Sequence, residues 1–441
     1  MTSKKFNLKA IKQGRSVYVL NSLWMISDRV INIVSAFVWS ILLARSLGID
    51  GFGNYNAITS CIALLLPIAA FGLNGLLNKL ILEKKKDLST IILSGLILKL
   101  LAGVVCILLA CLWFHYSKAL ELNKINFTYS CILILFSLQV FESLNQAFSS
   151  SQVISLCRFF TVSFFLFVKI YFWMYDLLTL NIALILQACE YLAYFVCIAY
   201  WSMSKYRNSF SSSEDITFYR VIQTSKVMIT GGGLLILSGV AETINLRVDV
   251  LMLTELSSLD SVSIYSVATK FSESGYFFAA AIATSFFPKI MKSKSVDESA
   301  YYNDLNGLVK KLNYVCVGIF AVTIIFAYPA IYYLYGHQYK DAYFVLLIHL
   351  FASFFVYFRA VFSKWLIVEN LFKYSLLTHL FGGVVNVLLN IILIPTYDYY
   401  GAAIATIISY AFSSYFSLLF FKKTRSYLTN INFNIFWWLV K

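Results

Sequence analysis

The sequence is poor in charge and in the residues that interrupt helices. Only 13% of its 441 residues are charged and 60% are hydrophobic, whereas about a quarter of a typical soluble domain is charged. Its mean hydropathy is +0.76. With 4 prolines and 19 glycines, the long apolar runs can remain helical, and they lack the alternating pattern of a membrane β-barrel. A soluble globular domain is therefore excluded, and lipid must solvate most of the chain.

Motifs for nucleotide or metal chemistry are also missing from the sequence. The run Gly231–Gly233 lacks the Lys-Ser/Thr that completes a phosphate-binding loop, and it favours close helix packing or a bend. The eight cysteines lie inside apolar runs without the paired spacing of a zinc or redox site. We therefore expect no cofactor, no metal site and no ATP hydrolysis, and we expect the chain not to be an enzyme.

Apolar runs long enough to cross a bilayer recur from one end of the chain to the other. Breaks rich in charge, Gly, Asn or Asp divide them into twelve predicted spans. The spans lie near residues 17–44, 55–80, 89–114, 127–149, 153–175, 180–201, 226–254, 262–288, 309–335, 341–368, 373–395 and 401–421. The weakest break, at 149–152, separates the fourth span from the fifth.

The Lys and Arg residues that are assigned to one side of the membrane or the other fall almost entirely on one side. Counting Arg158 at the start of the fifth span among them, 23 lie on this side, and only Lys118, Lys124 and Lys340 lie on the other. The positive-inside rule then places both termini in the cytoplasm, which requires an even number of spans. The same rule accounts for the net charge of +14, so we expect no nucleic-acid partner.

The longest hydrophilic connection lies at the midpoint and suggests two similar halves. We predict an all-α membrane protein with six-helix bundles at 1–205 and 226–425, a cytoplasmic linker at 206–225 and an interfacial tail at 426–441. At an offset of 210 residues, Leu43, Asp50, Tyr55 and Thr59 fall on Leu253, Asp260, Tyr265 and Thr269. Six spans per half give both copies the same orientation, so a pseudo-two-fold axis along the membrane normal relates them.

Two polar stripes coincide at the same offset. The first span carries Asp28, Asn32, Ser35 and Trp39, and the seventh carries Ser238, Glu242, Asn245 and Asp249. Spacings of four, three and four residues put each stripe on one helical face. We expect both stripes to line a shared cavity, with Asp28, Glu242 and Asp249 as coupling or cavity groups and Asn32 and Asn245 as substrate ligands. The alternative is that the stripes hold helices together through hydrogen bonds.

Basic residues at membrane depth are candidates for binding an anion. Polar groups there are costly and usually functional. The candidates for substrate binding are Arg29, Arg247, Lys270, Arg359 and Lys364. Lys99 also lies at membrane depth, Lys169 is expected to reach outward to the membrane surface, and Lys270 and Glu273 could neutralise each other. Arginine offers a planar fork of donors that suits phosphate.

A family resemblance accompanies these patterns. The stretch 43–55, Leu-Ala-Arg-Ser-Leu-Gly-Ile-Asp-Gly-Phe-Gly-Asn-Tyr, resembles the outer turn of polysaccharide flippases in the multidrug/oligosaccharidyl-lipid/polysaccharide exporter superfamily. Their pattern there is roughly A-R-x-L-G-x-x-x-F-G-x-Y. Further similar segments lie at 264–268, 286–289, 335–342 and 401–406, in the family's order. The chain is most similar to bacterial O-antigen flippases.

The resemblance implies transfer of undecaprenyl-diphosphate-linked oligosaccharide from the cytoplasmic to the periplasmic leaflet of the bacterial inner membrane. It also implies alternating access around a cationic cavity, with Arg29 as the counterpart of a family cavity arginine. Membrane lipid, a polysaccharide polymerase and a chain-length regulator are the expected partners. Two alternatives remain open: a multidrug or cation antiporter of the same superfamily, and a membrane polysaccharide polymerase, which would need a sizeable outer loop.

Overall fold

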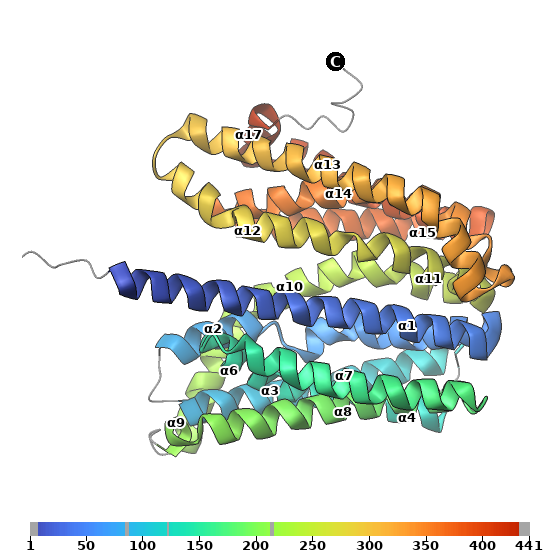
Figure 1. The fold of residues 1–441 in the computed structure, drawn as a ribbon, viewed down its shortest axis with the longest axis horizontal. Helices are drawn as coiled ribbons and strands as arrows, with labels where there is room; N and C mark the ends of the chain where they lie inside the picture. The colour runs from blue at the N-terminus through green and yellow to red at the C-terminus, as the bar shows by residue number, and fades with distance from the viewer. Residues whose placement is uncertain (1–7, 84–87, 121–122, 212–215, 432–441) are drawn as a thin grey trace, which may run out of the picture. The chain divides into compact units, whose positions relative to one another are not determined.

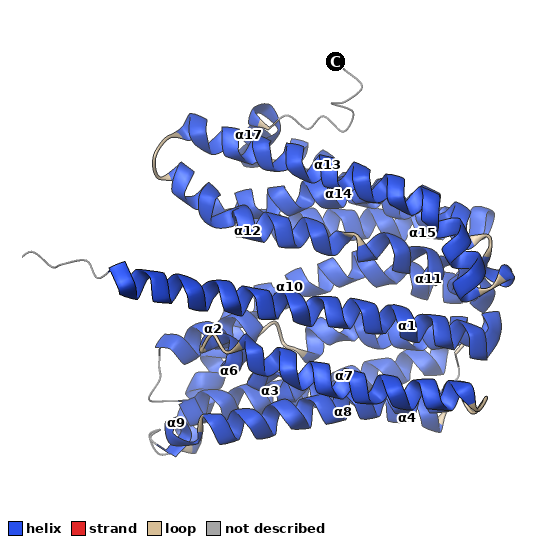
Figure 2. Ribbon diagram, viewed as in Figure 1, coloured by secondary structure: helices blue, strands red, loops and turns tan. Residues whose placement is uncertain are grey.

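The computed structural model describes residues 8–83, 88–120, 123–211 and 216–431, and within these ranges every regular element is a helix (Figure 2). The long helices of the first half of the sequence are α1 (Leu8–Ala69), α2 (Asn74–Glu83), α3 (Leu88–Tyr116), α7 (Ser151–Met174) and α8 (Leu180–Lys205). The fourth predicted span is a series of short pieces: α4 (Lys124–Ser130), α5 (Ile132–Leu135), the 3-10 turn η2 (Phe136–Gln139) and α6 (Val140–Ala147). The short α9 (Arg207–Ser211) follows α8.

The second half of the sequence continues with α10 (Phe218–Leu256), α11 (Leu259–Ser274), α12 (Tyr276–Lys294) and α13 (Glu298–Ala330). After the π-helical η3 (Ile331–Tyr335) and the 3-10 turn η4 (His337–Tyr339) come α14 (Ala342–Val368) and α15 (Phe372–Ala411). The π-helical η5 (Phe412–Phe416), α16 (Ser417–Phe420) and α17 (Lys422–Asn430) end the described chain. Most of the predicted tail, residues 432–441, lies outside the described residues.

Two of the longest helices each contain a break that divides them. Gly48 interrupts α1 at a φ of 69°, and Asp398 interrupts α15 at a φ of 53°. With these divisions, the described helices follow the order of the predicted spans, of which the fourth consists of short pieces. The predicted weak break after the fourth segment is also present, since Ser149 has a φ of 53° between α6 and α7. The all-helical prediction is confirmed.

Eight helical stretches within the described residues are long and apolar enough to cross a membrane. The first, Trp24–Glu83, contains the break at Gly48, and the last, Lys373–Phe420, contains the break at Asp398. The segments α10 and α11–α12 are not among the eight, and they carry Arg247, Asp249 and Lys270. Polar residues inside otherwise apolar helices lower the mean hydropathy of those helices and indicate a functional role.

The chain forms two compact units. One comprises Met1–Leu42, Leu66–Cys111 and Phe127–Ile236, and the other comprises Leu43–Leu65, Leu112–Asn126 and Leu237–Lys441. The segments 43–65 and 112–126 precede the midpoint of the sequence, yet they pack with the second unit. We refer to these as the first and second units.

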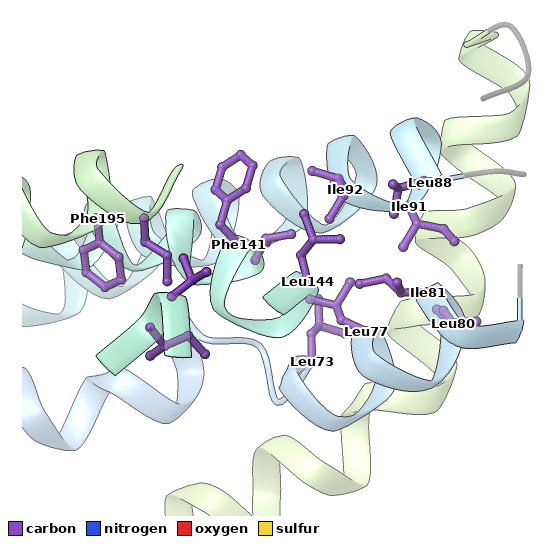
Figure 3. Close-up of a cluster of buried hydrophobic side chains, with 14 of the residues drawn as sticks. Leu73, Leu77, Leu80, Ile81, Leu88, Ile91, Ile92, Phe141, Leu144 and Phe195 are labelled. Carbon is purple, nitrogen blue, oxygen red and sulfur yellow. The ribbon is translucent and has the colours of Figure 1, made fainter. Parts of the chain in front are cut away.

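In the first unit, an aliphatic core joins α2, α3 and α6. Leu77 and Ile81 of α2, Ile91 of α3 and Leu144 of α6 are fully buried and point toward one another (Figure 3). Met228, in the first part of α10, packs on the same core. In a lipid environment such packing stabilises through van der Waals contact rather than through removal of apolar surface from water, and here it fixes α2 beside α6.

In the second unit, aromatic side chains form much of the core. Tyr301, Phe358, Phe362, Trp365 and Tyr427 are buried in one cluster contributed by α13, α14 and α17. The helices α12, α13 and α14 lie side by side (Figure 1). The cluster holds α17 against α14, so residues 422–430 pack as part of this unit.

Close packing joins the turn of α1 to α11 within the second unit. A Cβ on Gly53 would lie 2.0 Å from the carbonyl oxygen of Leu259, so only glycine fits this approach. The hydroxyl of Ser263 donates to the carbonyl of Ile49. Tyr339 of η4 donates to the carbonyl of Gly48 at 3.1 Å, so the segment is held from two sides.

Candidate functional site

A cluster with excess positive charge lies between α10 and α11 in the second unit. The Nη2 atom of Arg247 on α10 is 3.4 Å from Oε2 of Glu273 on α11. Lys270, one turn before Glu273, interacts electrostatically with both residues, and no hydrogen bond or ion pair is described for it among residues of the resolved ranges. Two bases therefore share one carboxylate, so the expected mutual neutralisation of Lys270 and Glu273 does not describe this site.

The cluster is accessible enough to receive a ligand. The side chain of Arg247 is 36% exposed and that of Glu273 is 21% exposed. Tyr410 interacts electrostatically with both of them, and its ring lies 6.3 Å from that of Tyr276. Arg247 and Glu273 are separated by a long and weak contact. An anion could therefore take the guanidinium without breaking a tight ion pair.

Asp249 lies two residues further along α10, in a buried hydrogen-bond cluster. Its carboxylate accepts from Asn390 at 2.6 Å, from Tyr265 at 2.7 Å and from Thr406 at 2.6 Å. Asn386 accepts a hydrogen bond from Asn390. The hydrogen-bond partners of Asp249 within the described chain are neutral, so its negative charge is stabilised by dipoles rather than by a base.

The polar stripe of α10 makes contacts within the second unit. Asn245 is buried and donates to the carbonyl of His379 on α15 at 3.1 Å, and Asp249 bonds to α15 through Asn390. The alternative prediction, hydrogen bonding between helices, therefore describes these two residues. Glu242 is exposed, and nothing is described for the side chain of Ser238.

The polar stripe of α1 packs against α7 in the first unit. Arg158 of α7 donates to Asp28 at 2.6 Å and to Glu142 at 3.1 Å, and Tyr194 also donates to Glu142. Our assignment of Arg158 to a cytoplasmic surface is therefore wrong. It lies one-third of the way along α7, and its charge is matched to two carboxylates. Asn32 donates to the carbonyl of Asp28 at 2.9 Å.

Lys169 does not reach outward as expected. Its side chain is 2% exposed, it forms an ion pair with Glu190 of α8, and its Nζ lies 4.4 Å from the ring centroid of Trp39. An ion pair and a cation–π contact inside the unit replace the polar surroundings that a surface position would have offered. Trp39 and Ser35, the other members of the first stripe, are buried.

Arg359 is not available to a substrate in this structure. It is 7% exposed and donates to the Thr378 hydroxyl at 2.8 Å and to the carbonyls of Ser413 at 2.6 Å and Ser375 at 3.3 Å. The carbonyl of Ser413 lies in the π-helical η5. The described bonds of this guanidinium go to one hydroxyl and two backbone carbonyls, its buried Nε has no described partner, and the need for an anionic partner stays a prediction.

Two basic candidates remain, Lys364 in the second unit and Arg29 in the first. Lys364 is half-buried with its Nζ 5.5 Å from the ring centroid of Phe287, and Arg29 is exposed on α1. No acidic partner is described for Lys364 among the residues of the resolved ranges. Within the described residues of the second unit, the structure brings together Arg247 and Lys270 of the predicted basic ligands.

The repeat-related aspartates lie together at the turn held by Gly53. The side chain of Asp260 is within hydrogen-bonding reach of Asp50, and its Oδ1 atom is shielded from solvent. Burial raises the pKa of Asp260, and the neighbouring Asp50 raises it further. A proton shared between two carboxyl groups is the simplest arrangement that keeps such a pair in contact.

Sequence reasoning missed two groups of residues. Glu142 stands alone in the predicted fourth span, and its acidic character inside an apolar run was the available signal. Lys99 was noted only for its depth, and its partners Asn74 and Gln139 lie where helices break. No local pattern links these positions, because they meet only through the packing of α2, α3 and α6.

Apolar helices in two units, with ionic groups inside them, are typical of a multi-pass membrane protein. Residues 19–294 match the family model described as polysaccharide biosynthesis protein, and the chain belongs to this family. The prediction of a polysaccharide-family membrane protein is confirmed. A search among curated proteins finds no match to this sequence.

Solved structures of two transporters and of a flippase have a similar fold. An inward-facing multidrug resistance MATE family transporter of the MOP superfamily has a TM-score of 0.70 at 14% identity, over 91% of this chain and 94% of that one. The lipid II flippase MurJ in an inward closed conformation has a TM-score of 0.66 at 15% identity, over 96% and 95%. A MOP superfamily transporter from Pyrococcus furiosus, whose binding pocket has reversed polarity, scores 0.64 at 14% identity, over 94% and 95%. The chain therefore has a flippase-type transporter fold.

Proposed function

We propose that the protein is a flippase for undecaprenyl-diphosphate-linked O-antigen units. It would move them by alternating access from the cytoplasmic to the periplasmic leaflet of the bacterial inner membrane, with both of its termini in the cytoplasm. Membership of the polysaccharide biosynthesis family and the likeness to a lipid flippase fold support this proposal. The observation that carries it is the sharing of one carboxylate, Glu273, by two bases, Arg247 on α10 and Lys270 on α11.

The chemistry of a diphosphate suits this cluster. Arginine binds phosphate oxygens through two parallel N–H donors, and lysine adds a compact positive charge. The guanidinium of Arg247 is only loosely held by Glu273 at 3.4 Å, so a diphosphate would strengthen its hydrogen bonding. Binding would thus replace part of the hydration that the head group loses on leaving water.

Glu242 and Asp249 have separate roles in this proposal. Glu242 is exposed on α10 and can accept hydrogen bonds from sugar hydroxyls. Asp249 is buried among neutral donors, so exchange of a coupling proton at its carboxylate would change the charge of α10 two residues from Arg247. The other predicted residues have at most a supporting part. Asp28 and Asn32 bond within the first unit and Asn245 bonds within the second. Lys364 is half-buried, and Arg29 is exposed on α1.

The alternative function, a multidrug antiporter, would need the opposite sign of charge at this site. Carriers of cationic drugs need an excess of negative charge, whereas the Arg247–Lys270–Glu273 cluster has an excess of positive charge. Loss of the protein should therefore leave susceptibility to cationic dyes unchanged. A marked increase in susceptibility on deletion would favour the antiporter.

The decisive experiment measures surface polysaccharide in a strain that lacks the protein, complemented at equal expression with Arg247→Ala, Lys270→Ala or Asp249→Asn. Reconstituted vesicles with a fluorescent polyprenyl-diphosphate disaccharide give the rate of transfer. Loss of one charge-assisted contact of about 1.5–3 kcal/mol should slow transfer about tenfold to a hundredfold for Arg247→Ala. Lys79→Ala, at a 67% exposed position, is the matched control.

Two results would distinguish a wrong site assignment from a wrong functional assignment. Wild-type transfer in both Arg247→Ala and Lys270→Ala would remove the cluster from the proposal while leaving the flippase assignment in place. Unchanged surface polysaccharide in the deletion strain itself would overturn the flippase assignment.

A further inference from the structure

Lys99 on α3 has a buried ammonium group with neutral hydrogen-bond partners. Its side chain is 0% exposed, and its Nζ donates to Asn74 Oδ1 at 2.7 Å and to Gln139 Oε1 at 3.3 Å. No ion pair to Lys99 is described among the resolved residues. A buried charge held by amide oxygens alone is poorly compensated, because two amide dipoles return less than a carboxylate does. Keeping such a group buried costs free energy, which indicates that it has a function.

Both partners of Lys99 lie at breaks in the helices. Asn74 is the first residue of α2, directly after a turn in which Phe71 and Gly72 have φ values of 54° and 58°. Gln139 is the last residue of the 3-10 turn η2, between α5 and α6. Asn74 also donates to Gln139 at 3.3 Å, so the lysine and the two amides form a closed triangle. The ammonium thus ties two irregular points of the first unit together.

One acidic group acts on Lys99 from the neighbouring helix. Glu142 on α6 interacts with it electrostatically and is itself bonded to Arg158 and Tyr194. Arg158 also binds Asp28. With both acids and both bases ionised, the two negative and two positive charges sum to zero. Loss of the lysine proton would leave this buried set with a net charge of −1.

We propose that Lys99 is a proton-binding site of the transport cycle, and that its protonated amine locks the two helix breaks together. The protonated form has three N–H donors, and charge makes its bonds to the amide oxygens about twice as strong as neutral ones. The neutral amine has two donors and a lone pair that faces other acceptors. Releasing the proton to water therefore loosens Asn74 from Gln139, and rebinding a proton restores the lock.

The lock connects to the helix that carries Arg247. A Cβ on Gly231 of α10 would lie 3.0 Å from Leu76, and one on Gly232 would lie 3.2 Å from the carbonyl of Phe71. The first part of α10 thus packs directly on the break that Asn74 follows. A change in this break would be felt by α10, since a close-packed contact transmits displacement rather than absorbing it. This last step rests on the proposed transport function, whereas the lock itself does not.

Hydrogen–deuterium exchange of the whole protein in lipid nanodiscs tests the lock without a substrate. Backbone exchange in segments 70–78 and 131–140 is measured from about pH 5 to about pH 9 and corrected with α8 as the internal reference. We expect both segments to become less protected together as the lysine loses its proton. Equal protection across this range in the wild-type protein would overturn the proposal.

Three substitutions make the test specific. Lys99→Arg retains a charge that cannot be removed, so the pH step should disappear. Asn74→Asp has nearly the same shape and places a carboxylate beside the amine, so the step should move upward by about one to three pH units. Lys79→Arg, at the exposed position on α2, should leave the step unchanged. A step that persists unchanged in Lys99→Arg, or that does not move in Asn74→Asp, would contradict the assignment.

Transport adds a second and separable measurement. If the lock serves the transport cycle, Lys99→Arg should reduce surface polysaccharide at least tenfold and flatten the pH dependence of transfer in vesicles. Wild-type transport in Lys99→Arg would restrict the lysine to a structural role and overturn the proposal. That result would leave the flippase assignment intact, because the latter depends on the deletion strain.

Discussion

Two arginines predicted at membrane depth, Arg247 and Arg359, have different surroundings in the structure. Substitution of Arg359 should therefore affect stability, and substitution of Arg247 should affect transfer. Arg359 of α14 gives its donors to Thr378 and to the carbonyls of Ser413 and Ser375. Arg359→Met should leave these acceptors unpaired and lower the unfolding free energy of the second unit by about 1.5–3 kcal/mol. A fall in the thermal midpoint in detergent measures this loss.

Arg247→Ala is the matched comparison for this prediction. Its guanidinium is 36% exposed and holds Glu273 only at 3.4 Å, so its removal should change the thermal midpoint little while abolishing most transfer. An Arg359→Met protein with an unchanged midpoint and defective transfer would reverse the two roles. Arg359 would then return to the list of substrate ligands.

The sequence identifies which residues are polar at membrane depth but not which groups satisfy them. Arg247 and Arg359 look alike in the sequence, because the partners of Arg359 lie on α15 and η5, which are remote in the chain. Arg158 was misplaced because it follows a weak break, and its partners Asp28 and Glu142 come from two other helices. Charge pairing across helices is a property of packing, so one sequence cannot supply it.

At the scale of helices and turns, the pair Asp50 and Asp260 predicts a pH-dependent contact. The pKa of Asp260 is raised by burial and by Asp50, so the folded protein binds this proton more tightly than the unfolded chain does. Stability should therefore fall as the pH rises from the ordinary aspartate range through the raised value. Thermal midpoints between about pH 4 and about pH 8 should show this slope in the wild-type protein.

Asp50→Asn should flatten the slope, because it removes the like charge and leaves only burial acting on Asp260. Asp176→Asn is the control, since it makes the same change at an exposed turn between α7 and α8. A slope as steep in Asp50→Asn as in the wild-type protein would show that the two carboxyl groups are not coupled.

Gly53 gives a steric prediction for the same turn. An added Cβ would lie 2.0 Å from the Leu259 carbonyl oxygen, and neither backbone can move away easily. Gly53→Ala should therefore destabilise the second unit by about 1–3 kcal/mol or more. Gly75→Ala, where nothing lies within 4 Å, should be neutral or slightly stabilising because alanine favours a helix. Equal midpoints for both variants would contradict the close approach of α1 and α11.

The order of the helices could be predicted because the length of an apolar run and the residues that interrupt it are local properties of the sequence. The break at Gly48 lies inside the predicted turn 45–54, and Asp398 lies between the eleventh and twelfth predicted spans. The irregular η2, η3 and η5 were not predicted, since 3-10 and π geometry depends on what packs against each turn. The predicted division at 206–225 assumed that each half of the sequence packs with itself. Segments 43–65 and 112–126 of the first half, however, pack with the second unit.

At the scale of the whole molecule, the two units differ in how their buried charges balance. In the first unit, Arg158 has two acids and Lys169 has one. In the second unit, Arg247 and Lys270 share Glu273. This asymmetry means that the pair Arg247 and Lys270 can attract an anion, whereas Arg158 and Lys169 are already paired with acids. Substrate chemistry should therefore depend more strongly on substitutions in the second unit.

The orientation of the chain is the remaining prediction at this scale. Excluding Arg158, 22 Lys and Arg residues are assigned to one side of the membrane and three to the other, and such an excess marks the cytoplasmic side. An alkaline phosphatase fusion, active only in the periplasm, should be active after residue 177, between α7 and α8, and inactive after residue 208 in α9. A green fluorescent protein fusion should give the opposite pattern. Since α8 alone separates the two points, equal activity at both would mean that α8 does not cross the membrane, and a reversed pattern would place the termini in the periplasm. Either result would remove the distribution of Lys and Arg as support for the proposed direction of transfer.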